Sequence, residues 1–66
     1  MNSIGYNLRK LRSRNDLTQK QVSEATGISI HLINNYETNK EFPQKHEIVK
    51  FAKFYKVEIE EILIGK

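Results

Sequence analysis

The sequence predicts an all-α fold, a compact bundle of five short helices, on three observations. Apolar residues recur at helical spacing along most of the 66 residues. Residue types that begin or end helices stand at the borders of these segments. No stretch alternates apolar and polar residues for long enough to predict a strand. A chain of this length forms one domain, here expected over residues 1–66.

The first predicted helix carries Ile4, Leu8 and Leu11 on one face. It should end near Asn15 and Asp16, because both residue types favour turns.

The second predicted helix begins with a capping box. Thr18 is followed three residues later by Gln21, so the two can satisfy each other's free backbone N–H groups. Leu17 and Val22 flank this box and form a hydrophobic staple. We expect Val22 and Ala25 to face the core.

A third helix follows almost at once. Gly27 suits the left-handed residue that ends a helix, and Ser29 is the next N-cap candidate. Ile28 and Ile33 then repeat the staple, and the helix should run over residues 30–38. Two short helices separated by a few residues that include glycine are typical of a helix-turn-helix.

Two further helices follow the loop at residues 39–43. The fourth carries Ile48, Phe51, Ala52 and Tyr55 on one face. The last, roughly residues 58–64, supplies Ile59, Ile62 and Leu63, and Gly65 is placed to end it.

Composition narrows the class of function. The net charge is +3, and its positive excess lies within the first 20 residues, which favours a polyanionic partner. The absence of cysteine excludes disulfides and thiol chemistry. Because the sequence shows neither a signal peptide nor a membrane-spanning run, we expect a cytoplasmic protein that does not bind membranes.

The polar side of the third helix is the candidate site. A helical projection places His31, Asn34, Asn35 and Thr38 on this side, with no acidic group among them. Asn pairs with the N6/N7 edge of adenine, so this face suits the major groove of DNA. A solvated surface is the alternative, but two adjacent Asn residues weaken a short helix without structural benefit.

Other residues are predicted to bind DNA phosphates or to stabilise the packing of the helices. Gln19 and Lys20 follow the Thr18 cap, where a helix N-terminus attracts anions. Lys40 lies just beyond the third helix, where it can hold a phosphate across the groove. We assign the same phosphate-contacting role to Ser29 and Thr38, which border the third helix. If the first helix crosses the third, Arg12 and Glu37 form a partly buried ion pair.

Together these residues resemble the Cro/repressor helix-turn-helix family, also called the XRE family. The residues that carry the resemblance are Leu17-Thr18-Gln19, Val22, Ala25, Gly27-Ile28-Ser29, Ile33, Tyr36-Glu37, Pro43, Ala52, Val57 and Ile62-Leu63. The resemblance covers residues 4–63. It implies a lambda repressor-like five-helix bundle, a bacterial or phage transcription regulator, and a homodimer on a palindromic operator.

The resemblance also implies roles for single residues. Gln19 matches the family's phosphate-contacting glutamine, and Arg12 with Glu37 its recurrent ion pair. The base-reading positions fall on Ile30, His31, Asn34 and Asn35. The sequence departs from the family at Asn39 and Lys56, where glycine is common, and also at Lys45, Phe54 and Glu58.

Two rival functions remain. An enzyme is disfavoured, because the sequence has no phosphate loop, no nucleophile elbow and no histidine pair at metal-ligand spacing. We therefore expect no catalytic residue, metal, cofactor or small-molecule substrate. A protein-interaction module, such as an antitoxin or a polymerase partner, would use the apolar residues Phe42, Phe54, Ile59 and Ile64. We prefer Phe54, Ile59 and Ile64 as a dimer interface, and a repressor as the biological role.

Overall fold

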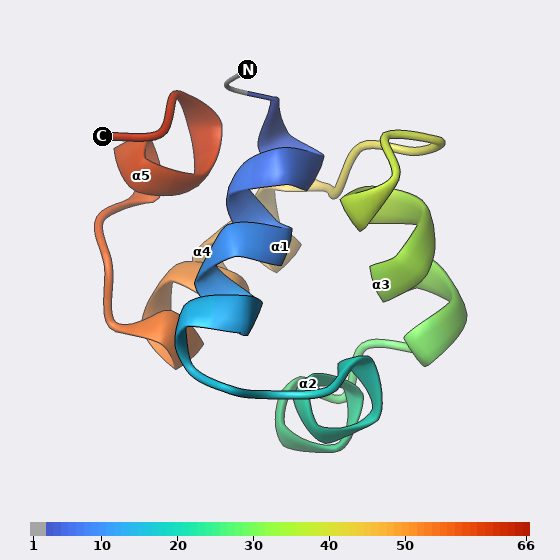
Figure 1. Ribbon diagram of the computed structural model, residues 1–66. Coiled ribbons are helices and arrows are strands. Elements are labelled where there is room, and N and C mark those ends of the chain that lie inside the picture. The colour runs from blue at the N-terminus through green and yellow to red at the C-terminus, as the bar shows by residue number, and fades with distance from the viewer. Residues whose placement is uncertain (1–2) are drawn as a thin grey trace.

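The computed structural model describes residues 3–66 and confirms the all-α fold (Figure 1). Its five helices are α1 (Ile4–Arg14), α2 (Gln19–Thr26), α3 (Ile30–Glu37), α4 (Lys45–Tyr55) and α5 (Ile59–Leu63). Helix α1 runs through the middle of the bundle and packs against both α3 and α5. Helix α2 packs against α3 and α4, and α4 packs against α5. None of the described helices is long and apolar enough to span a bilayer.

One hydrophobic core joins all five helices. Its buried residues are Leu8, Leu11, Val22, Ile28, Ile33, Tyr36, Phe51, Ala52, Tyr55 and Ile62. Most are the residues that helical spacing places on inward faces. Phe51 lies at the centre, where its ring packs edge-on against Tyr36 and parallel to Tyr55, each with ring centroids 6.4 Å apart. The core therefore ties the third helix to the fourth.

One expectation about the core was wrong. Ala25 is exposed, and the buried partner of Val22 is Thr26, one full turn further on. Thr26 is accommodated because its hydroxyl donates to the Val22 carbonyl at 2.7 Å and accepts from the Ile28 N–H at 3.2 Å. In α5, Ile62 alone is buried, whereas Ile59 and Leu63 are 37% and 40% exposed.

A buried polar contact that the sequence did not predict joins α1 to α5. Asn7 is 1% exposed, and its Nδ2 donates to the Ile62 carbonyl at 2.8 Å. This bond satisfies the amide nitrogen and joins α5 to α1, whereas Asn7 Oδ1 is buried without a hydrogen-bond partner among the described residues.

Asn39 and Lys56 both adopt left-handed backbone conformations, with φ of 62° and 58°. These are positions where the resemblance expects glycine. Asn enters this region more readily than Lys does, and its side chain accepts from the Gly5 N–H at 3.2 Å. Gly5 is required here, because a Cβ would lie 2.7 Å from Asn39 Oδ1 and closer still to the Tyr36 carbonyl oxygen. The end of α3 therefore packs directly on the start of α1.

Candidate nucleic-acid interface

The turn between α2 and α3 forms as the sequence predicts. The capping box of Thr18 and Gln21 begins α2, and Gly27 ends it in the left-handed region at φ 76°. Ser29 then caps α3 by accepting from the His31 N–H at 3.1 Å. Ser23 adds a bond to the turn, because its hydroxyl donates to the Ile28 carbonyl at 2.6 Å. The angle between the two helices is therefore fixed by short-range contacts.

The two sides of α3 differ as predicted. Its inner residues Ile33, Tyr36 and Glu37 are buried. On its outer side Ile30, His31, Asn34 and Thr38 are exposed, and Asn35 is half-buried. The structure thus gathers the predicted base-reading residues on one outward surface, which we call the reading face: Ile30, His31, Asn34 and Asn35.

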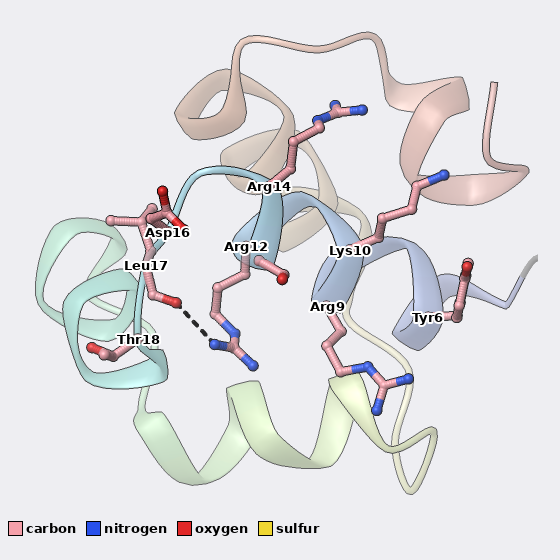
Figure 2. A pocket seen from close by; sticks show the side chains of 9 residues that line it. Tyr6, Arg9, Lys10, Arg12, Arg14, Asp16, Leu17 and Thr18 are labelled. Carbon is pink, nitrogen blue, oxygen red and sulfur yellow. Dashed lines mark hydrogen bonds between the residues drawn. The ribbon is translucent and has the colours of Figure 1, made fainter.

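The predicted ion pair is present and holds α3 on α1. Arg12 Nε donates to Glu37 Oε2 at 2.7 Å, and Arg12 Nη2 donates to Glu37 Oε1 at 2.9 Å. The third guanidinium nitrogen, Nη1, donates to the Leu17 carbonyl at 2.9 Å (Figure 2). The hydrogen bond with Glu37 raises the pKa of Arg12, although partial burial opposes this. One guanidinium therefore fastens α1, α3 and the turn before α2 together.

Gln19 extends this network to the reading face. Its Nε2 donates to Glu37 Oε1 at 3.1 Å and to Asn34 Oδ1 at 3.4 Å. The side-chain amide is thus engaged within the protein. The backbone N–H groups of Gln19 and Lys20 lie in the first turn of α2, outside the helical ladder, where the positive end of the helix dipole favours an anion.

The other predicted phosphate contacts differ in what they can donate. The Ser29 hydroxyl accepts from a backbone N–H, so its own proton stays available. The Thr38 hydroxyl donates to the Asn34 carbonyl at 2.8 Å, and its proton is therefore engaged. Lys40 is exposed just past the end of α3. Ser29 and Lys40 are thus the better placed donors.

A shallow groove along α1 adds positive charge beside the start of α2. Figure 2 shows side chains of α1 and of the following turn around it, with Arg9 and Arg12 extending on the side of α3. Arg14 is paired with Glu61 at 2.8 Å, and Lys10 Nζ lies 5.9 Å from the centroid of the Tyr6 ring. Arg12 and Arg14 are therefore neutralised by carboxylates, and Arg9 is the further basic side chain of the groove that extends toward α3.

The polar side of α3 contains no acidic residue of its own, but the loop that follows brings Glu41 beside it. Asn35 Nδ2 donates to Glu41 Oε2 at 2.8 Å. The left-handed residue Asn39 reverses the chain after α3, and the backbone N–H groups of Lys40 and Glu41 then reach the Asn35 carbonyl. Asn39 is the feature of the sequence that could have predicted this reversal, since a left-handed residue after a helix turns the chain back toward the last turn of the helix.

Tyr36 anchors the inner side of α3 to the start of α4. Its hydroxyl donates to Glu47 Oε1 at 2.7 Å, and the same oxygen accepts from the Gln44 N–H at 2.9 Å. Burial and the bond to Glu47 raise the pKa of Tyr36 to about 12. Burial tends to raise the pKa of Glu47, but the hydrogen bonds from Tyr36 and Gln44 outweigh it and lower that pKa.

These pKa shifts predict how the stability lost in the Tyr36→Phe variant depends on pH. Near neutral pH we expect a loss of about 1.5–3 kcal/mol in unfolding free energy, as for a hydrogen bond to a charged group. A raised tyrosine pKa gives stability that is complete below pH 10 and lost as pH rises through about 12. A lowered Glu47 pKa gives stability that is present above about pH 4.5 and lost as pH falls below it.

The difference between wild type and Tyr36→Phe should therefore be largest between about pH 5 and pH 10 and shrink on both sides. Urea unfolding followed by circular dichroism at a series of pH values measures it. A difference that stays constant from pH 4 to pH 11 would contradict the role assigned to this bond.

Comparison with known proteins agrees with this architecture. A family model described as a helix-turn-helix domain matches residues 5–66. The chain is also similar to the HTH-type transcriptional activator BcrR of Enterococcus faecalis, with 34% identity over 59 residues. This match covers 89% of the chain but 29% of the relative, so the chain spans less than a third of the length of that protein. The chain belongs to the helix-turn-helix domain family.

Proposed function

We propose that this protein binds duplex DNA as a homodimer at a palindromic operator and regulates transcription, as a repressor where that operator overlaps a promoter. The observation that carries the proposal is the reading face, where His31 and Asn34 are exposed and Asn35 is half-buried on one side of α3. Amides and an imidazole offer the donors and acceptors that recognise base edges in the major groove.

The surroundings of the reading face suit the DNA backbone. The first turn of α2, Ser29 and Lys40 border α3 and present donors for phosphates. The basic groove along α1 continues this positive surface beyond Arg12. Backbone contacts of this kind set affinity and register, while base contacts set sequence preference.

The size of the site supports the proposed homodimer. One such module covers only about 600–1,000 Å² of DNA interface, and two copies would place their α3 helices about 34 Å apart on one side of the duplex. Ile59 and Ile64 are 37% and 50% exposed at the α5 end of the bundle and are available for such an interface. Phe54 is half-buried against Tyr55, with ring centroids 5.0 Å apart, and contributes its remaining surface.

Selection of binding sites from a random duplex library, with sedimentation of the protein–DNA complex, tests the proposal. We expect enrichment of a palindrome and two chains per duplex. If the protein binds no duplex at low salt, the proposal is wrong. The exposed apolar residues, including Phe42 at 71% exposure, would then favour the protein-interaction module as the function.

Asn35→Ala should weaken binding to the selected duplex by about 1–3 kcal/mol and leave binding to random duplex nearly unchanged. The physical reason is that the Asn35 amide pairs with a base edge rather than a phosphate. Fluorescence anisotropy with the two duplexes measures both constants. Equal losses on both duplexes would instead make Asn35 a backbone contact.

Lys40→Ala should weaken binding to every duplex to a similar degree. Because a lysine at a phosphate displaces one counterion, the slope of log K against log salt should flatten by about 0.9. Lys53→Ala, an exposed lysine on α4, is the matched control and should change the slope less. A loss at Lys40 that depends on the base sequence would show that this side chain reads bases.

A further inference from the structure

The bond between Asn35 and Glu41 has a consequence for base preference, which rests on the proposed function. A carboxylate accepts hydrogen bonds and does not donate them, so the Asn35 amide must turn its nitrogen toward Glu41. The distance of 2.8 Å is that of a charge-assisted bond. Glu41 therefore fixes the orientation of an amide that is otherwise free to rotate by half a turn.

The fold holds Glu41 in place for this contact. The Asn35 carbonyl accepts from the Lys40 and Glu41 N–H groups at 2.9 and 3.3 Å, so the loop folds back over its own helix. Asn39 attaches the same loop to α1, where its Oδ1 accepts from the Gly5 N–H and its Nδ2 donates to Ser3 Oγ at 3.1 Å. Glu41 thus lies on a loop that is fastened at both α3 and α1.

The fixed Asn35 amide presents one hydrogen-bond acceptor and one donor to DNA. One N–H of Asn35 is used by Glu41, which leaves Oδ1 and the second N–H to pair with DNA. Adenine offers the matching pair, an N6–H donor and an N7 acceptor. Guanine offers two acceptors, N7 and O6, and Asn35 cannot turn both of its N–H groups to them while Glu41 holds one.

Glu41 also places a negative charge beside a surface proposed to contact DNA. Such a charge opposes binding to any duplex, because the phosphate backbone is negative. Its effect on total affinity and its effect on base choice therefore have opposite signs. We propose that Glu41 is a positioning residue that makes base recognition by Asn35 selective for adenine over guanine, at the expense of non-specific affinity for DNA.

The experiment compares base preference in four proteins. The base pair read by Asn35 is located first, as the position where Asn35→Ala loses preference in the selected site. Wild type, Glu41→Ala, Glu41→Gln and Glu60→Ala are then titrated with duplexes that carry adenine or guanine there, and with random duplex. Glu60 is exposed on α5, so Glu60→Ala removes the same charge away from α3.

We expect wild type to prefer adenine by about ten-fold or more, within the range of a bidentate contact. Glu41→Ala should lose most of this ratio and bind random duplex more tightly than either wild type or Glu60→Ala. Glu41→Gln keeps an acceptor but not the charge, so it should retain more of the ratio while binding random duplex more tightly. A merely structural role for Glu41 would leave the ratio unchanged.

Failure of this inference is distinct from failure of the proposed function. If wild type selects no sequence, the proposed function is wrong and the inference falls with it. If wild type selects a site but Glu41→Ala keeps the same ratio of adenine to guanine, the inference alone is wrong. The inference is also wrong if the position that depends on Asn35 holds a base other than adenine.

Discussion

Arg12→Ala should destabilise the protein by about 3–5 kcal/mol, the usual loss when one partner of a buried ion pair is removed. The Glu37 side chain is 3% exposed, and without Arg12 it keeps the bond from Gln19 as its support. The Leu17 carbonyl loses its donor as well. A domain of this size has roughly 3–10 kcal/mol of total stability, so the variant should be largely unfolded or close to it.

The chain contains a matched control for this substitution. Arg14 pairs with Glu61 at the same kind of distance, 2.8 Å, but their side chains are 55% and 25% exposed. Exposed pairs contribute about 0–1 kcal/mol, so Arg14→Ala should be nearly neutral. Urea unfolding followed by circular dichroism measures both variants. Equal losses of unfolding free energy in Arg12→Ala and Arg14→Ala would show that the buried charge of Glu37 is not the cause of the destabilisation.

A double variant separates stability from orientation. Replacing Arg12 and Glu37 together by Met and Leu removes both charges, and such replacements are often neutral or stabilising. The double variant should therefore fold although Arg12→Ala does not. If it also loses sequence preference while keeping non-specific DNA binding, the pair serves to orient α3 rather than to stabilise the bundle.

Phe51→Ala should cost about 3–5 kcal/mol, because it opens a cavity in the middle of the core. Phe51 is 1% exposed and lies between the rings of Tyr36 and Tyr55. Its loss removes two aromatic contacts and the packing that holds α3 against α4. We expect a variant that is mostly unfolded at room temperature by near-ultraviolet circular dichroism and that does not bind DNA.

Phe42→Ala is the control for this second prediction. Phe42 is 71% exposed, so removing its ring should change the unfolding free energy by no more than about 0.5 kcal/mol. Phe51→Leu retains part of the buried volume and should fold with a smaller loss, which allows a measurement where Phe51→Ala gives none. If Phe51→Ala stayed within 1 kcal/mol of wild type, the core would not depend on this ring.

Local patterns in the sequence predicted the helices because caps, turns and apolar spacing act over a few residues. Thr18 with Gln21 determines where α2 begins, Gly27 where it ends and Ser29 where α3 begins, and the structure has each in the predicted role. Ala25 shows the limit of this reasoning. An apolar residue near the edge of a helical stripe can face either way, and the polar Thr26 is buried instead because it satisfies its own hydroxyl.

The all-α fold, the helix-turn-helix and the polar outer side of α3 were predictable from the amino-acid sequence, since these features depend on residue spacing along single helices. Tertiary structure alone decided the contact of Glu41 with Asn35, the bond from Asn7 to α5 and the inward engagement of Gln19. Each of these contacts joins side chains through the reversal of a loop or the crossing of two helices. Their geometry depends on the direction that the backbone takes at turns, and a periodic pattern of residues does not encode that direction.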